Sequence, residues 1–244
     1  MKAIQTSGLT KKFGTKTAVN ALNLSIEQGE LFALLGVNGA GKTTTIRMLS
    51  CLTSPTSGDA ILLGDSIINN PSGVKAKINI SPQETAVAPN LTIKENLELI
   101  AGIYGSDKKQ ARQRADEMLT AFSLTKEASS KAKTLSGGMQ RRLSIAMALI
   151  TSPQILFLDE PTLGLDVLAR RELWTAIKKL KGKITVILTT HYMEEAEALS
   201  DRIGIMSTGV LKAVGTAEEL IAKTGAKTFE DAFVALATES EGQL

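Results

Sequence analysis

Cysteine and histidine are nearly absent from this sequence, which has one residue of each, Cys51 and His191. A single cysteine excludes an internal disulfide and favours a reducing compartment. One cysteine and one histidine also exclude a zinc cluster built from such ligands within one chain. Cys51 lies in an apolar helical pattern, so we expect a buried structural thiol rather than a reactive one.

Long apolar runs are missing as well. No stretch approaches the roughly 18 apolar residues that cross a bilayer, and residues 1–5 do not begin the apolar core of a signal peptide. Charge is balanced, since 28 basic residues face 25 acidic ones, and this balance argues against a nucleic-acid partner. Because 43% of the 244 residues are hydrophobic, the chain can bury a large core. We therefore expect a globular, cytoplasmic protein that reaches a membrane only through a partner.

Strand-like apolar runs alternate with helical stretches, and this alternation predicts an α/β fold with a mainly parallel sheet. Residues 91–150 differ, because they are almost all helical in pattern, and we expect a helical insert on the same domain. The predicted strands are Ala18–Ile26, Leu31–Leu35, Ile155–Leu158, Ile184–Leu188 and Ile203–Met206, the last in a hairpin with Val210–Val214. The predicted helices are Lys42–Leu52, Ile93–Tyr104, Lys108–Phe122, Gly137–Ile150, Val167–Leu180 and Tyr192–Leu199.

Three capping boxes mark helix starts, each pairing a threonine with an acidic residue three positions later. They are Thr92 with Glu95, Thr216 with Glu219, and Thr228 with Asp231. The last precedes a C-terminal stretch, Phe229–Leu236, whose apolar residues share one helical face. We expect this face to dock onto the domain's own surface, and contact with a partner is the alternative.

A glycine-rich segment with the pattern G-x-x-x-x-G-K-[ST] lies between an apolar strand and a helical run. Its glycines allow successive N–H groups to turn toward one anion, and the following helix directs its positive dipole end at the same point. Lys42 would neutralise the β- and γ-phosphates of ATP, and the Thr43 hydroxyl would ligate Mg²⁺. A plain glycine turn, the alternative, does not require Lys-Thr in this register. The nucleotide-binding residues expected here are Gly36, Asn38, Gly39, Ala40, Gly41, Lys42, Thr43 and Thr44.

Two carboxylates, Asp159 and Glu160, follow the apolar run Ile155–Leu158. Ligands of open α/β sheets bind beyond the C-terminal ends of the strands, so both side chains are expected in the phosphate site. Asp159 is placed to hold Mg²⁺ through water, and Glu160 to orient or deprotonate the water that attacks the γ-phosphate. A strand that merely ends in charged residues is the alternative, and the phosphate loop in the same chain argues against it.

A second anion-binding helix end is predicted at Ser136, Gly137 and Gly138. Ser136 would cap the helix, and the two glycines would expose its first N–H groups. One chain thus has two phosphate-binding helix ends but a single Lys-Thr loop. A dimer resolves this mismatch, because each nucleotide can lie between the loop of one subunit and the Ser-Gly-Gly end of the other.

These motifs, in this order over nearly the whole chain, resemble the ATP-binding-cassette (ABC) family. The resemblance implies that Gln83 contacts Mg²⁺ and the attacking water, and that His191 contacts the γ-phosphate. It also implies that Leu163–Asp166 crosses a dimer interface, with Asp166 near the nucleotide. Phe13 occupies the place of an aromatic residue, more often tyrosine, that stacks on adenine, and a plain core residue is its alternative. An antiparallel β arm and a helical subdomain carrying the Ser-Gly-Gly end are further implications.

The same resemblance implies an architecture and partners. Residues 1–225 would form a P-loop nucleotide-binding domain with the helical subdomain at about 91–150, and residues 226–244 a short helical extension. Two identical or related subunits would close on ATP and part after hydrolysis. They would drive an integral membrane permease from its cytoplasmic face, through the cleft near Gln83. The amino-acid sequences of several segments look like those of stand-alone subunits of ABC-2 type exporters of sodium, drugs or polysaccharides.

Two other functions remain open from the sequence. A soluble ATPase that remodels something other than a transporter would share these motifs. A nucleotide-binding regulatory module with negligible turnover is disfavoured, because such a module has no use for Glu160. In the ATPase interpretation the catalytic residues are Glu160, His191, Gln83 and Lys42, and the metal ligands are Thr43, Gln83 and Asp159.

Overall fold

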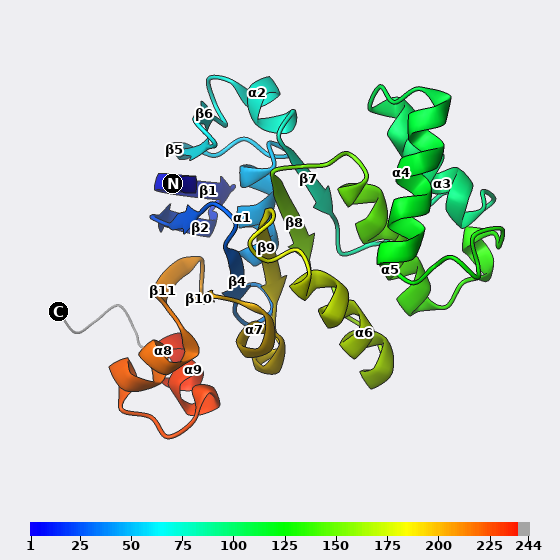
Figure 1. The fold of residues 1–244 in the computed structure, drawn as a ribbon. Coiled ribbons are helices and arrows are strands. Elements are labelled where there is room, and N and C mark those ends of the chain that lie inside the picture. Colours follow the sequence, from blue (N-terminus) through cyan, green and yellow to red (C-terminus); the bar gives the residue numbers. More distant parts are fainter. Residues whose placement is uncertain (239–244) are drawn as a thin grey trace.

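The computed structural model describes residues 1–238, so the end of the predicted 226–244 extension lies outside the described residues. Its centre is a six-stranded sheet in the order β11-β10-β4-β9-β8-β7, parallel except for the β10–β11 hairpin (Figure 1). The predicted α/β fold with a mainly parallel sheet is confirmed, as is the hairpin. The strands are β4 (Leu31–Leu35), β7 (Ile78–Ser81), β8 (Ile155–Asp159), β9 (Thr185–Thr190), β10 (Arg202–Ser207) and β11 (Val210–Gly215).

Successive side chains along the central strands point to opposite faces of this sheet, which divides the hydrophobic core in two. In β4, Phe32 and Leu34 pack on one face, whereas Leu31, Ala33 and Leu35 pack on the other. All five are buried. The strand is therefore apolar throughout, as expected for a parallel strand that is covered on both faces.

An antiparallel β arm and the helix after the glycine-rich loop share the core on the first of these faces. The predicted single strand Ala18–Ile26 is wrong, because residues 23 and 24 separate β2 from β3. Near the end of β2, Ala21 already has a left-handed φ of 44°. Asn23 lies in this break, and its side chain accepts a hydrogen bond from the Gly8 N–H (2.8 Å). The elements are β1 (Lys2–Phe13), β2 (Lys16–Leu22), β3 (Ser25–Glu27), β5 (Ser57–Leu62), β6 (Asp65–Ser66), α1 (Lys42–Leu49) and α2 (Pro71–Lys75).

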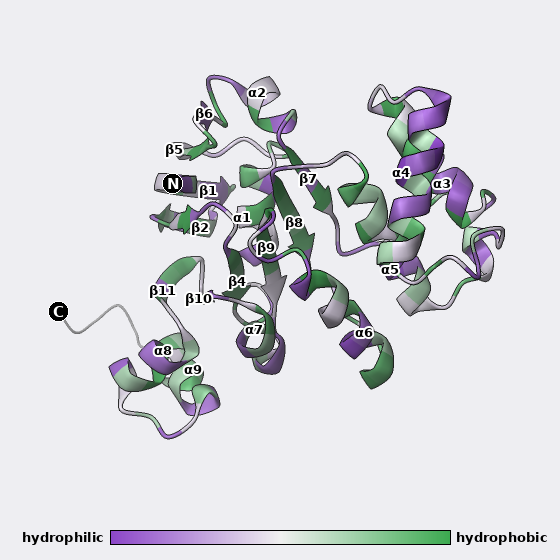
Figure 2. Cartoon of the chain, viewed as in Figure 1, coloured by the Kyte–Doolittle hydropathy of each residue, from purple (hydrophilic) through white to green (hydrophobic). Residues whose placement is uncertain are grey.

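A group of helices lies beside the β7 edge and forms the predicted helical insert (Figure 1). Its first helix begins with the predicted capping box, in which Thr92 Oγ1 accepts from the Glu95 N–H (3.1 Å) and Glu95 Oε2 from the Thr92 N–H (2.7 Å). Figure 2 shows α4 as largely hydrophilic, in contrast to the strands of the central sheet. The helices of the insert are α3 (Ile93–Ile103), α4 (Lys108–Ala121) and α5 (Gly137–Leu149), with a 3-10 turn at Ala132–Thr134.

Four further helices pack in the second half of the core. They are α6 (Val167–Lys178), α7 (Met193–Leu199), α8 (Ala217–Thr224) and α9 (Phe229–Thr238). The predicted docking of the C-terminal face onto the domain itself is confirmed, because Phe229 and Leu236 are buried in this core. Thr216 caps α8 in a complete capping box, also as predicted. Within residues 1–238, no helix has the length and apolar character that crossing a membrane requires.

The environment of Cys51 differs from the prediction. Helix α1 ends at Leu49, and Cys51 follows it in a turn with a left-handed φ of 56°. The thiol is half-buried, and this burial raises its pKa. The prediction of a buried thiol within a helix is therefore wrong, because Cys51 is only half-buried and follows the helix.

Candidate active site

The glycine-rich segment forms a loop between β4 and α1 that surrounds the ammonium group of Lys42. Lys42 Nζ donates to the carbonyl oxygens of Gly36 (2.7 Å) and Val37 (3.2 Å). Gly41 precedes α1 with a left-handed φ of 102°, and a Cβ there would collide with the carbonyl oxygen of Ala18. Both the backbone conformation and the available space therefore require glycine at this position.

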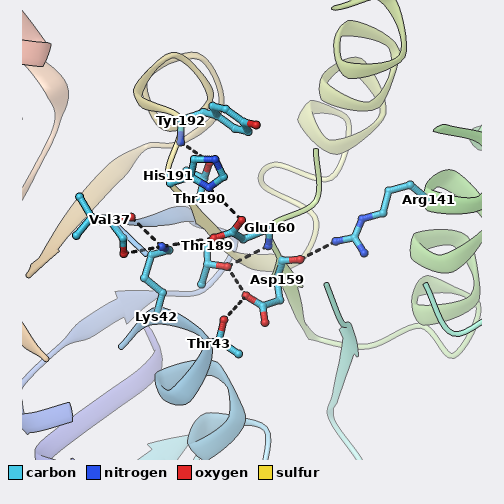
Figure 3. Close-up of polar contacts among 11 residues, drawn as sticks. Val37, Lys42, Thr43, Arg141, Asp159, Glu160, Thr189, Thr190, His191 and Tyr192 are labelled. Atoms are coloured by element: carbon cyan, nitrogen blue, oxygen red, sulfur yellow. Dashed lines mark hydrogen bonds and ion pairs between the residues drawn. The ribbon is translucent and has the colours of Figure 1, made fainter. Parts of the chain in front are cut away.

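Side chains from the ends of β8 and β9 meet this loop (Figure 3). Glu160 Oε1 lies 3.5 Å from Lys42 Nζ, and Glu160 Oε2 lies 3.0 Å from His191 Nδ1. Asp159 Oδ1 accepts a hydrogen bond from the Thr43 hydroxyl (3.1 Å). Burial lowers the pKa of Lys42, and the charges of Glu160 and Asp159 oppose this shift. The structure thus brings together five of the predicted site residues.

Thr189, which the sequence analysis did not single out, orients both carboxylate residues. It is fully buried in β9. Its hydroxyl donates to Asp159 Oδ1 (2.6 Å) and accepts the N–H of Glu160 (3.0 Å). Its backbone carbonyl also accepts that N–H (3.2 Å). The parallel register that pairs Asp159 with Thr189 creates these contacts, and this pairing cannot be read from either segment alone.

A cavity of about 520 Å³ opens beside these side chains, a size suited to a small-molecule ligand. Gln83, in the loop after β7, lines it. The Phe13 ring at the end of β1 also lines it and is 54% exposed, so the interpretation of Phe13 as a core residue is wrong. The predicted site residues that line the cavity are Phe13, Asn38, Gly39, Ala40, Gly41, Lys42, Thr43, Thr44, Gln83, Glu160 and His191.

The predicted second anion site does not line this cavity. Ser136 caps α5, as predicted, and its Oγ accepts from the Met139 N–H (3.3 Å). A Cβ on Gly138 would lie 2.9 Å from the Cβ of Ala169 in α6, whereas a Cβ on Gly137 would meet nothing within 4 Å. The first glycine therefore leaves open space at the helix end, and the second allows α5 and α6 to approach closely.

Asp166 likewise does not line the cavity and has a local structural role within the chain. It is the N-cap of α6, and its Oδ1 accepts from the N–H groups of Leu168 and Ala169, both at 2.9 Å. The described chain therefore holds two sets of predicted nucleotide ligands, one at the cavity and one outside it.

Comparison with known proteins identifies the family. The sequence profile described as ABC transporter matches residues 19–163. The daunorubicin resistance ATP-binding protein DrrA3 of Streptomyces coeruleorubidus is 42% identical over 224 residues, covering 91% of this chain and 71% of that protein. The chain belongs to the ABC transporter family. It is an ATP-binding subunit, and its hydrolysis of ATP drives transport.

Other members of the ABC transporter family agree with this assignment. The linearmycin resistance ATP-binding protein LnrL of Bacillus subtilis (strain 168) is 43% identical over 226 residues, covering 92% of this chain and 73% of that protein. A solved ATP-binding cassette, a dimer in a post-hydrolysis state bound to ADP and Pi, superimposes with a TM-score of 0.79 at 29% identity. That similarity covers 87% of this chain and 98% of the other. ABC cassettes dimerise and pair with membrane subunits.

Proposed function

We propose that two copies of this chain, or one copy and a related subunit, enclose ATP and power an ABC-2 type exporter of drug-like compounds. The observation that supports this most directly is the separation of the two sets of nucleotide ligands. The glycine-rich loop and Glu160 line the cavity. Ser136 and Gly137, by contrast, lie at the N-terminal end of α5, and this helix end does not line the cavity. A second copy would supply its own Ser136 end to the ATP held here.

Within one copy, the cavity residues divide the work of hydrolysis. Lys42 would neutralise phosphate charge, and the exposed Phe13 ring would stack on adenine. Glu160 would act as general base toward water, because its carboxylate lines the cavity beside the loop. His191, 3.0 Å from that carboxylate, would hold it in orientation and contact the γ-phosphate.

The residues beside Lys42 also fit Mg²⁺. The Thr43 hydroxyl and the Asp159 carboxylate lie 3.1 Å apart, and both present oxygen, the ligand atom that this hard cation prefers. Gln83, which lines the same cavity, would be a third ligand. When bound, Mg²⁺ would neutralise charge on the β- and γ-phosphates.

Exposed apolar side chains next to the cavity favour a protein partner on this side of the molecule. Leu163 lines the cavity and is 41% exposed, and Val167 and Leu168 at the start of α6 are 64% and 73% exposed. Apolar groups clustered in this way mark contact surfaces more often than free ones. A second copy docked here would cover these side chains. Docking would also bring Asp166, which lies between Leu163 and Val167 in sequence, close to the nucleotide site of the second copy.

The export function rests on the relatives. Two relatives that are 42% and 43% identical are named as ATP-binding proteins for resistance to daunorubicin and linearmycin. We infer that this chain serves an integral membrane permease for compounds of that general kind, from the cytoplasmic face of the membrane. The alternative, an ATPase that remodels a soluble partner, predicts that no integral membrane protein co-purifies with the tagged chain.

The test is the Glu160→Gln variant, which keeps the shape of the side chain but removes the base. We expect it to bind Mg-ATP, to hydrolyse it at least 100-fold more slowly, and to accumulate as a dimer. Size-exclusion chromatography with light scattering, with and without Mg-ATP, measures this. The matched control is Glu197→Gln, an exposed position on α7, which should behave as the wild type. If Glu160→Gln still turns over, the proposal is wrong, and if it stays monomeric at saturating ATP, closure of two identical copies is excluded.

A further inference from the structure

Arg141, in the second turn of α5, carries a buried guanidinium group that reaches the active-site backbone (Figure 3). Its Nη2 donates to the carbonyl oxygen of Asp159 (2.7 Å), and its Nε to that of Pro161 (2.9 Å). Its Nη1 donates to the carbonyl oxygens of Gln83 (3.3 Å) and Pro82. One side chain therefore binds the segment around Glu160 and the loop that carries Gln83.

The two carbonyls on either side of Glu160 are both held by this guanidinium. Glu160 itself has a left-handed φ of 45°, a conformation that costs a non-glycine residue energy and persists only where its surroundings impose it. The peptide between Asp159 and Glu160 is fixed from both sides. Its carbonyl accepts from Arg141, and its N–H donates to Thr189.

Stability alone does not explain the burial of Arg141, because burying its charge costs free energy. Its four acceptors are neutral carbonyl oxygens, and among the ion pairs of residues 1–238 none involves Arg141. Burial lowers the pKa of Arg141 to about 10, so the group is still a cation at neutral pH. Burying a charge that has no ion-pair partner costs free energy, which hydrogen bonds to neutral groups offset only in part. Its rigid, planar set of donors, by contrast, suits the task of fixing several carbonyls in one geometry.

We propose that Arg141 is a positioning residue for ATP hydrolysis, which holds the strained backbone of Glu160 and the Gln83 loop in one fixed arrangement. The proposal rests on the function proposed above for Glu160. Because Arg141 belongs to the helix that begins at Ser136, it also links that helix end directly to the base of the same chain. Among the residues that line the cavity, its side chain donates to the Gln83 backbone alone, so we expect ATP binding to change little without it.

The experiment compares Arg141→Lys with Arg141→Met. Lysine keeps the charge but loses the planar set of guanidinium N–H donors, whereas methionine keeps a similar length and loses every donor. Arg202→Met is the control, since Arg202 also donates to a backbone carbonyl, that of Ser25 (2.8 Å), although it is half-buried and pairs with Glu30. It lines no part of the cavity. For each variant, kcat, KM and the dissociation constant for ATP are measured, together with the thermal midpoint.

We expect kcat to fall about tenfold in Arg141→Lys and about 100-fold in Arg141→Met, because misplacing a reacting group by about 1 Å has effects of this size. The ATP dissociation constant should stay within about twofold of the wild type, since the glycine-rich loop is untouched. Arg202→Met should lose thermal stability but keep its kcat per folded molecule. If Arg141→Met does not fold, Arg141→Lys decides the question alone.

Two results would overturn the inference. One is an unchanged kcat in both Arg141 variants. The other is a loss of kcat that only follows the loss of folded protein, as a purely structural arginine would give. Adding Thr189→Val sharpens the test, because both side chains hold the same peptide, and the double variant should lose less than the product of the single losses. Losses that multiply would contradict a shared action on Glu160. A Glu160→Gln variant that still hydrolyses ATP would instead refute the proposed function.

Discussion

The carboxyl group of Glu195 is fully buried in α7, four residues after His191. Trp174 Nε1 donates to its Oε1 (3.0 Å). Burial raises the pKa of Glu195, and hydrogen bonds from its neighbours and the charge of Arg170 oppose the shift only in part. The folded protein therefore binds a proton at this position more readily than the unfolded chain does.

This shift gives a pH-dependent prediction for Glu195→Gln. A raised folded pKa contributes stability below the unfolded value of 4.5, and that contribution is lost as pH rises through the folded pKa. Glutamine keeps the acceptor for Trp174 but cannot ionise. We expect the variant to melt above the wild type at about pH 8, with a difference that shrinks toward pH 4.5. Calorimetry across this range measures it, with exposed Glu197→Gln as control, and a difference independent of pH would contradict it.

At the residue scale, the sequence predicted the groups that carry charge or hydroxyls in recognisable patterns. Lys42, Thr43, Asp159 and Glu160 all come within hydrogen-bonding or ion-pair reach, as their spacing indicated. Arg141 and the threonine that orients the carboxylates could not be predicted in this way. Their partners are backbone groups or register neighbours from other segments, and such contacts exist only once the strands and α5 are in place.

Among the elements, α3 owes its first turn to Thr92. The Oγ1 of this side chain accepts the Glu95 N–H, which otherwise lacks a partner inside the helix. We expect Thr92→Ala to lower the free energy of unfolding by about 1 kcal/mol. Urea denaturation measures the change. Thr120→Ala in α4 is the control, because its hydroxyl bonds only within its own helix, and it should be neutral or slightly stabilising. An equal loss in both variants would show that capping is not the cause.

Elements with strong periodicity were predicted to within a few residues, and α3 and α4 begin where expected, at Ile93 and Lys108. The strand β1 (Lys2–Phe13) was missed, although it has 12 residues. Its burial pattern is irregular because it pairs with three strands through several bulges. A bulged strand of this kind leaves no clean alternation for a sequence analysis to detect.

For the molecule as a whole, ATP should act as a stabilising ligand. At about 100 times its dissociation constant it contributes roughly 2.7 kcal/mol, which corresponds to a rise in Tm of about 5–10 °C for a chain of this size. We expect Lys42→Ala to abolish this rise in a thermal shift assay with Mg-ATP. Lys94→Ala, whose surface ammonium pairs with Asp116, should retain it. An undiminished shift in Lys42→Ala would contradict the assignment of the phosphate site.

The fold class followed from the alternation of strands and helices, because covering both faces of a parallel sheet requires it. The pairing order did not follow, since β4 lies between β9 and β10, which come more than 150 residues later in the chain. Nor does one chain display the arrangement proposed for the nucleotide. The helix end at Ser136 and the glycine-rich loop would meet only across two molecules.

The left-handed backbone at Glu160 keeps a carboxylate in the active site but lowers the stability of the fold. Asparagine and glycine adopt this conformation more easily than glutamate does, so either would relieve a cost of order 1–3 kcal/mol at the end of a buried strand. Neither offers a carboxylate of the same reach. A chain that kept the fold but no longer needed to hydrolyse ATP could therefore accept either residue here with a gain in stability.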